Sequence, residues 1–161
     1  RDAGAACVLL AEASGAAGMA GGQAIDLDAT GRAMTEAELE RMHRMKTGAL
    51  IRVSVRLGAA AGRPLAAGEL AALDAYANAA GLAFQVVDDV LDVEGSTATL
   101  GKTAGKDAAQ GKPTYVSLLG LAGAKARAAA LADEAHAALA PFGAASRRLA
   151  EVADSIVRRS H

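Results

Sequence analysis

An acidic segment in the middle of the chain has the residue types and spacing of a cation site. Asp88, Asp89 and Asp92 closely follow Gln85, and on a helix these four side chains share one face about 100° wide. Asp88 and Asp92 lie one turn apart, where like charges repel, and no Lys or Arg lies between residues 64 and 101. Mg²⁺ commonly combines one or two carboxylates with waters and phosphate oxygens. The segment therefore predicts a site for Mg²⁺ or Ca²⁺, and a solvated acidic helix face is the alternative.

Two basic segments have the composition of phosphate-binding groups. Lys46-Thr47-Gly48 interrupts a helical pattern, and Gly48 can loosen the helix so that an ammonium and a hydroxyl face a cavity. The segment 101–112 contains three Gly-Lys pairs, from Gly101-Lys102 to Gly111-Lys112. It is not a P-loop, because Ser96 stands where that motif needs its first Gly and no strand precedes it. Solvated surface is the alternative for both segments.

Further polar residues are weaker candidates. Gln23 and Asp26 follow Gly21-Gly22 and share one helix face with small neighbours, which predicts a cavity lining or a polar helix end. The histidines show no metal-ligand spacing, and each is expected at the surface or its boundary: His43, His136 and His161.

The elements that must position these residues are predicted to be helices throughout. Apolar residues recur at three- and four-residue steps, and no strand alternation or internal repeat is found, which predicts an all-α fold. The expected helices cover 1–28 with a bend near Gly15, 35–62 with an interruption at Gly48, 67–94, 114–119, 122–139 and 146–159. The expected start and stop signals are Thr35 with Glu38 as a capping box, Pro113 at a first helical position, Ser146 as an N-cap and Arg158-Arg159 in a last turn.

Composition excludes several classes of protein. The 161 residues suit about one domain, and 52 % hydrophobic with only 2 % aromatic residues favours packed helices over a β-sandwich. A net charge of −1 and the lack of a basic stripe argue against a nucleic-acid partner. The longest uncharged stretches, 13–25 and 75–87, are shorter than a span of about 20 residues, so no membrane span is expected. The single cysteine, Cys7, is expected to be buried, and its isolation favours the cytoplasm.

In this order along the chain, the segments resemble the second half of a trans-prenyl diphosphate synthase. The matching residues are Gly21-Gly22-Gln23 with Asp26-Leu27, Lys46-Thr47-Gly48, Phe84-Gln85 with Asp88-Asp89 and Asp92, Gly101-Lys102, and Gly111-Lys112. The chain is most similar to the bacterial-type farnesyl diphosphate synthases, over essentially its whole length. The resemblance implies the isoprenoid synthase helical bundle, in which residues 1–161 form the C-terminal part of one domain.

The resemblance also implies a metal and an anion site. Two facing aspartate-rich motifs of this family hold three Mg²⁺ around an allylic diphosphate, and Asp88-Asp89 with Asp92 matches the second motif. Asp88 would bind metal directly, while Asp89 and Asp92 would be further or water-mediated ligands. Lys46 and Lys102 would hold the allylic diphosphate.

Other roles follow from the same resemblance. Lys112 would be an outer cation that helps to close the site, Thr47 and Gln85 would stabilise the allylic cation, and Gln23 and Asp26 would line the cavity. The expected reaction joins the allylic diphosphate to isopentenyl diphosphate by ionisation, condensation and deprotonation, with farnesyl diphosphate as product. A homodimer is expected, as is usual for the family.

The first aspartate-rich motif has no match in these residues, nor do the groups that bind isopentenyl diphosphate. We expect both to lie upstream of residue 1, and we expect this piece alone to be inactive, with an exposed apolar inner face. Three alternatives stay open. They are a synthase of another chain length, such as a geranylgeranyl diphosphate synthase, a non-catalytic partner subunit of the same fold, and a terpene cyclase.

Overall fold

The computed structural model describes residues 3–98 and 111–159, and within these ranges every regular element is helical. The elements are α1 (Ala3–Ser14), α2 (Met19–Asp28), α3 (Glu36–His43), the π-helical turn η1 (Arg44–Gly48), α4 (Ala49–Ala60), α5 (Ala67–Ala98), α7 (Tyr115–Ala138), the 3₁₀ segment η2 (Ala140–Ser146) and α8 (Arg147–Val157). The predicted all-α fold is confirmed.

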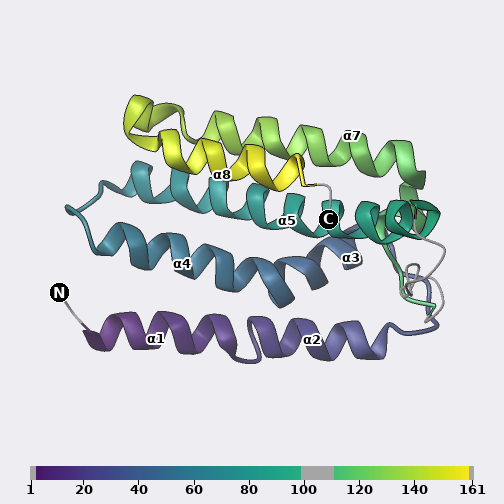
Figure 1. Ribbon diagram of the computed structural model, residues 1–161. Coiled ribbons are helices and arrows are strands. Elements are labelled where there is room, and N and C mark those ends of the chain that lie inside the picture. Colours follow the sequence, from purple (N-terminus) through teal and green to yellow (C-terminus); the bar gives the residue numbers. More distant parts are fainter. Residues whose placement is uncertain (1–2, 99–110, 160–161) are drawn as a thin grey trace.

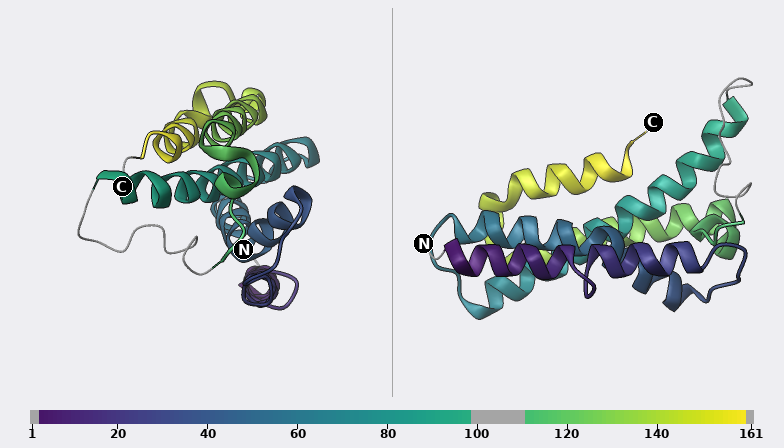
Figure 2. Two further views of the ribbon diagram at one scale, coloured as in Figure 1. Left: turned by 90° about the vertical axis from the view of Figure 1, so that its right-hand side faces the viewer. Right: turned by 90° about the horizontal axis from the view of Figure 1, so that it is seen from below.

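The long helix α5 is the centre of the arrangement. It packs most extensively against α7 and also against α8 on one side, and against η1 and α4 on the other (Figure 1). Helices α1 and α2 follow one another as an outer rod that lies along α4 and η1, as the end-on and lower views show (Figure 2). The continuous stretch of η1 and α4, which precedes α5 in the chain, and helices α7 and α8, which follow it, therefore meet around α5.

Small side chains allow this close packing. On α7, Ala124, Ala128 and Ala135 are all buried, and so is Leu131. An alanine stripe lets two helix backbones approach closely without the entropy cost of glycine. The phenol of Tyr76 on α5 adds a specific link, because its hydroxyl donates a hydrogen bond to the carbonyl of Leu149 on α8 at 2.8 Å.

The start of α3 agrees with the sequence. The Thr35 hydroxyl oxygen accepts a hydrogen bond from the Glu38 N–H at 3.3 Å, and the Glu38 carboxylate accepts one from the Thr35 N–H at 2.8 Å. This reciprocal capping box is the predicted one. The predicted break near Gly15 is also present, since α1 ends at Ser14 and α2 begins at Met19.

The start of α7 corrects the predicted position of Pro113. The helix begins at Tyr115, and Thr114 is its N-cap, with Ser117 completing a second capping box. Pro113 therefore lies one residue before the cap, outside the helix. The break predicted between helices 114–119 and 122–139 is confirmed, because Gly120 inside α7 has a non-helical backbone with a φ of 70°, which suits a residue without a Cβ.

Three predictions at the other helix ends were wrong. Helix α5 continues to Ala98 rather than ending at residue 94. Ser146 makes no side-chain cap, because η2 runs directly into α8 and its hydroxyl donates to the Gly143 carbonyl instead. Helix α8 ends at Val157, so Arg158 and Arg159 lie beyond its last turn.

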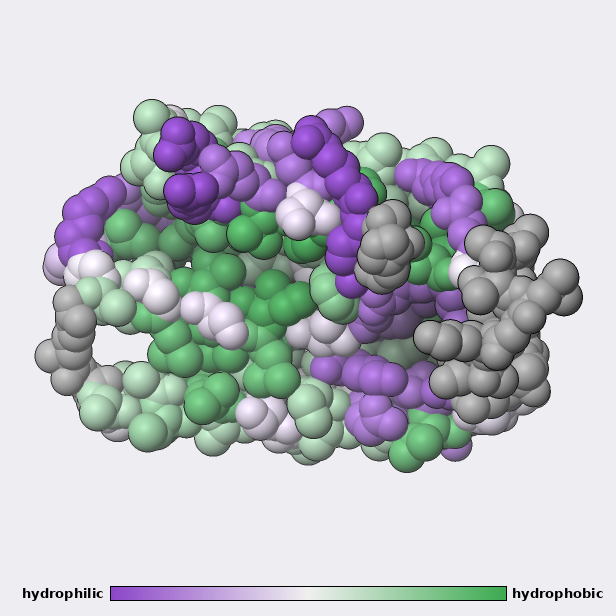
Figure 3. All heavy atoms as spheres, in the orientation of Figure 1, coloured by the Kyte–Doolittle hydropathy of each residue, from purple (hydrophilic) through white to green (hydrophobic). Residues whose placement is uncertain are grey.

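The outer rod exposes apolar side chains. Helix α1 has no buried residue, and Cys7 is exposed, which corrects the expectation of a buried thiol. Val8 and Leu27 are more than half exposed, and the apolar surface continues into a hollow between α1 and α4 (Figure 3). The environment of Cys7 was mispredicted because apolar neighbours in sequence do not ensure that another element covers them.

Two stretches meet the length and composition of a membrane span. Residues Ala67–Gly95 belong to the core helix α5, and 56 % of their most apolar window is buried inside the molecule. Residues Ala3–Asp28 include the break between α1 and α2, and 6 % of their window is buried. Core helices of soluble proteins meet the same requirement. The absence of a membrane span therefore stays a prediction.

Candidate functional site: a basic cluster beside the acidic segment

The π-helical turn η1 carries Lys46 and Thr47 at the centre of the candidate site. A π-turn contains an extra residue and commonly marks a functional position. It is packed between α2 and α5, and glycines make this possible. A Cβ at Gly22 would lie 2.2 Å from the Lys46 backbone nitrogen, and a Cβ at Gly81 would lie 3.4 Å from the Gly48 Cα. The sequence predicted that Gly48 would disturb the helix here, and the glycines of α2 and α5 hold the disturbed turn in place.

Lys46 and Lys112 share one carboxylate. The Lys46 Nζ lies 2.7 Å from Asp26 Oδ2, and the Lys112 Nζ lies 3.3 Å from the same oxygen. Lys112 reaches α2 because the Gly31 N–H donates to the Gly111 carbonyl at 3.1 Å, where both glycines have positive φ. Two ammonium groups on one carboxylate leave a net positive charge, which is the electrostatic requirement for binding an anion.

The pKa of Asp26 shows which effect dominates in this cluster. Burial of the carboxylate by itself raises the pKa, but the hydrogen bond and charge of Lys46, aided by Lys112, outweigh it and hold the pKa below its ordinary value. Asp26 therefore stays ionised, and it orients both lysines. Gln23, one turn earlier on α2, is half-buried, as a cavity-lining residue would be.

A hydrogen-bond chain joins this cluster to the acidic segment. The Thr47 hydroxyl donates to the Gln85 side-chain carbonyl across the η1–α5 contact. The Gln85 amide nitrogen then lies 3.5 Å from Asp88 Oδ2, at the long limit of a hydrogen bond. Lys46 and Thr47 are adjacent in η1, so this turn contacts Asp26 of α2 through one side chain and Gln85 of α5 through the next.

Asp88 has a partner that was not predicted from the sequence. The Arg159 Nη2 lies 2.8 Å from Asp88 Oδ1 and also donates to the Phe84 carbonyl at 3.0 Å. The guanidinium carbon lies 4.0 Å from the centre of the Phe84 ring, a cation–π distance. Arg159 was assigned to a helix end, and no local signal indicated that it would cross to α5.

Asp89 faces a different helix from Asp88. It is 6 % exposed, and its Oδ2 accepts a hydrogen bond from the Tyr115 N–H at 2.7 Å. This N–H is the first of α7, one of the donors that a helix leaves unpaired at its start. Asp89 therefore anchors α7 on α5. The acidic segment was expected to present one face about 100° wide, but in the structure Asp88 contacts Arg159 while Asp89 contacts the start of α7.

The accessible carboxylates of the acidic segment fit a Mg²⁺ ion whose other ligands are waters and phosphate oxygens. Within residues 3–98 and 111–159, no three His, Cys, Asp or Glu side chains are gathered as a metal site. Asp88, with a 41 % exposed side chain, and half-buried Asp92 present two carboxylates one turn apart. One or two carboxylates with waters and phosphate oxygens are the usual Mg²⁺ environment. The chemistry of the predicted metal residues thus suits the ion, with Asp89 the least accessible of the three.

His43 corrects the surface position predicted for it. It is 8 % exposed and stacks on Tyr115, with ring centres 5.9 Å apart and an angle of 20° between the planes. Among the residues that the structure describes, neither of its ring nitrogens has a hydrogen-bond partner, and the Tyr115 hydroxyl has none either. Burial, helped by the charge of Lys46, lowers the pKa of His43 to about 4. Apolar pattern did not identify this position because a histidine in a helix usually faces water.

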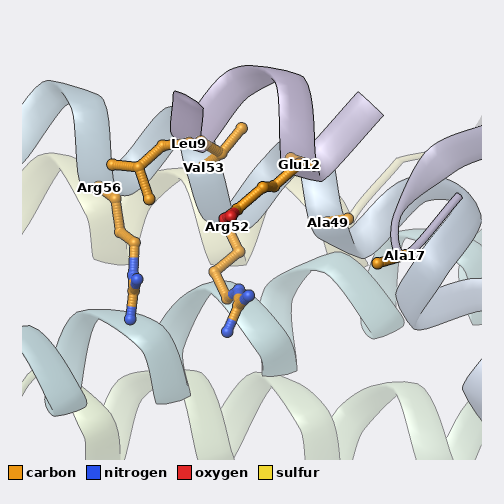
Figure 4. Close-up of a pocket in the computed structure, with 8 residues that line it drawn as sticks. Leu9, Glu12, Ala17, Ala49, Arg52, Val53 and Arg56 are labelled. Atoms are coloured by element: carbon orange, nitrogen blue, oxygen red, sulfur yellow. The ribbon is translucent and has the colours of Figure 1, made fainter. Parts of the chain in front are cut away.

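A separate cavity of about 270 Å³ lies between α1 and α4 (Figure 4). Its lining includes Leu9 and Val53, with Glu12, Arg52 and Arg56 as its charged groups. None of the predicted site residues lines this cavity. Lys102, the remaining predicted site residue, lies outside the described residues.

Comparison with known proteins identifies the class. Residues 5–140 match the family model described as Polyprenyl synthetase. The chain belongs to the polyprenyl synthetase family, in agreement with the order of motifs found in its sequence.

One curated protein and one solved structure are similar to this chain over nearly its whole length. The chain is 51 % identical over 154 residues to a farnesyl diphosphate synthase of Escherichia coli (strain K12), covering 94 % of this chain and 52 % of that protein. It matches a polyprenyl synthase of Caulobacter crescentus CB15, complexed with calcium and isoprenyl diphosphate, with a TM-score of 0.84 and 30 % identity over 97 % of this chain and 59 % of that one.

A third comparison concerns magnesium. A geranyltransferase of Helicobacter pylori, complexed with magnesium and isoprenyl diphosphate, matches with a TM-score of 0.74 and 29 % identity over 94 % of this chain and 50 % of that one. The chain thus spans about half the length of the relatives it matches.

Proposed function

We propose that residues 1–161 form one half of the active site of a prenyl diphosphate synthase. The reaction joins an allylic diphosphate to isopentenyl diphosphate, and farnesyl diphosphate is the product. The observation that supports this most is the convergence on η1: Lys46 contacts Asp26, which also binds Lys112, while the adjacent Thr47 contacts Gln85 beside Asp88. We further propose a cytoplasmic homodimer without a membrane span or a nucleic-acid partner.

The residues have distinct tasks in this proposal. Lys46 and Lys112 bind oxygens of the allylic diphosphate, and Lys102 joins them from the basic loop. Asp26 orients Lys46 and Lys112, because its buried carboxylate contacts both ammonium groups. Gln23, one turn before Asp26 on α2, lines the substrate cavity of the complete site. When Mg²⁺ is bound, held by Asp88 and Asp92, it neutralises the diphosphate so that the allylic C–O bond ionises more easily.

The polar groups of η1 and α5 then act on the carbon chain. As the diphosphate leaves, positive charge develops on the allylic carbons, and the oxygens of Thr47 and Gln85 can face it. Since Thr47 donates its proton to Gln85, its own oxygen lone pairs remain available for that charge. The cation alkylates the double bond of isopentenyl diphosphate, and a proton is lost to the released diphosphate. Asp89 holds α7 against α5 beneath this site.

A binding experiment tests the proposal on the chain itself. Inorganic diphosphate is titrated by calorimetry, with and without MgCl₂, into the wild-type chain, Lys46→Met and the matched control Lys125→Met, whose native side chain pairs with Glu94 on an exposed surface. We expect Mg²⁺-dependent binding that weakens about tenfold or more in Lys46→Met, since a hydrogen bond between charged groups contributes about 1.5–3 kcal/mol. Equal affinities in Lys46→Met and Lys125→Met would refute the site.

A turnover experiment tests the half-site. We expect no condensation of geranyl diphosphate with labelled isopentenyl diphosphate, because residues 1–161 contain a single Asp-Asp-x-x-Asp segment. Product formation by this chain alone would contradict the expectation. Absence of any Mg²⁺-dependent diphosphate binding would instead favour the non-catalytic partner subunit.

A further inference from the structure

Arg159 is placed on α5 by three contacts at once. Its guanidinium is an ion-pair partner of Asp88, a donor to the Phe84 carbonyl and a cation over the Phe84 ring. Phe84 and Asp88 lie one turn apart on the same side of α5, so the planar guanidinium bridges the turn that leads into the acidic segment. The Arg159 side chain is 25 % exposed, which makes this a partly desolvated contact.

The neighbouring arginine shows that this placement is specific. Arg158 is 79 % exposed and pairs with Asp154 one turn earlier, on its own helix. Two adjacent arginines at the end of α8 therefore behave differently, and only Arg159 crosses to the acidic segment.

Both oxygens of Asp88 already have a neighbour. Oδ1 accepts from Arg159 at 2.8 Å, and Oδ2 lies 3.5 Å from the Gln85 amide nitrogen. A divalent cation bound at Oδ1 would stand next to the guanidinium, where like charges repel and both compete for the same lone pairs. The two cations therefore exclude one another at this oxygen.

We infer that Arg159 is a displaceable counter-ion of Asp88, which holds the carboxylate until a divalent cation replaces it. This rests on the proposed function, in which Asp88 binds Mg²⁺. A cavity of about 320 Å³ borders Arg159, with Leu91 and Val157 in its lining, so a released guanidinium has space. The carboxylate of Glu94, which also lines this cavity, is already paired with Lys125. Arg159 thereby weakens cation binding in the unliganded protein and becomes available for another anion once the cation is bound.

The test measures cation affinity directly, without turnover. Mn²⁺ is titrated alone, and free Mn²⁺ is followed by electron paramagnetic resonance for the wild-type chain, Arg159→Gln and the matched control Arg158→Gln. We expect Arg159→Gln to bind Mn²⁺ about two- to fivefold more tightly, the effect of one partly exposed ion pair, and Arg158→Gln to match the wild type. In an Asp88→Asn background, Arg159→Gln should have no effect.

The outcomes separate this inference from the proposed function. Equal tightening by Arg159→Gln and Arg158→Gln would show a general charge effect and overturn the inference, as would unchanged affinity in Arg159→Gln. If neither the wild type nor Arg159→Gln binds Mn²⁺, both the inference and the cation site of the proposed function fail. Binding by Arg159→Gln but not by the wild type supports the inference, and circular dichroism establishes that every variant is folded.

Discussion

Acidification from pH 7 to pH 5 should weaken the folded chain through His43. This imidazole is buried against Tyr115 at the end of α3, next to the turn that carries Lys46. Burial and the charge of Lys46 lower the pKa of His43 to about 4, whereas in the unfolded chain it has the ordinary value of about 6.5. Between these values the unfolded chain binds a proton that the folded chain does not. The stability from neutral His43 is therefore complete above about pH 6.5 and is lost as the pH falls toward 4.

The size of the effect follows from the two pKa values. Linkage gives a loss of about 2 kcal/mol in the free energy of unfolding between pH 7 and pH 5. This is a large part of the stability of an ordinary domain. The loss should be absent from His43→Leu, in which no group titrates at this position.

Urea unfolding followed by circular dichroism at both pH values measures the difference. The matched control is His136→Gln, because His136 is exposed and pairs with Asp154 at the surface. We expect the wild type and His136→Gln to lose about 2 kcal/mol more than His43→Leu on acidification. Equal losses in the wild type and His43→Leu would refute the reasoning. An NMR titration of the His43 ring protons with a midpoint near 6.5 would refute it independently.

Two further predictions concern the packing of the site. Gly22→Ala should lower the free energy of unfolding by about 1–3 kcal/mol, because its Cβ would collide with the Lys46 backbone. Gly58→Ala should raise the free energy of unfolding by about 0.5–1 kcal/mol, because a Cβ at this position on α4 meets open space. Urea unfolding in which Gly22→Ala is as stable as Gly58→Ala would contradict this account of the packing. Asp89→Ala should lower the free energy of unfolding by about 1–3 kcal/mol, because it leaves the Tyr115 N–H without its acceptor. Hydrogen exchange at the start of α7 measures this contact, and an unchanged exchange rate in Asp89→Ala would show that Asp89 does not anchor the helix.

Local signals determined much of the architecture. Helix periodicity and the capping box at Thr35 depend on residues within one or two turns, so a sequence contains them completely. The same holds for the spacing of Asp88 and Asp92 and for the order of motifs, which was enough to indicate the family. Helix ends were less well predicted where another element intervened, as when α5 passed residue 94.

Tertiary structure alone decided what each polar side chain does. Adjacent residues on α5 point to different neighbours, so Asp88 meets Arg159 of the segment after α8 while Asp89 meets the backbone of α7. The burial of His43 and the exposure of Cys7 likewise depend on which element covers them. The physical reason is the sequence distance over which each interaction acts. Hydrogen bonds between residues four apart form a helix and so determine which side chains share one of its faces. The packing of helices that are distant in sequence determines which neighbours that face contacts.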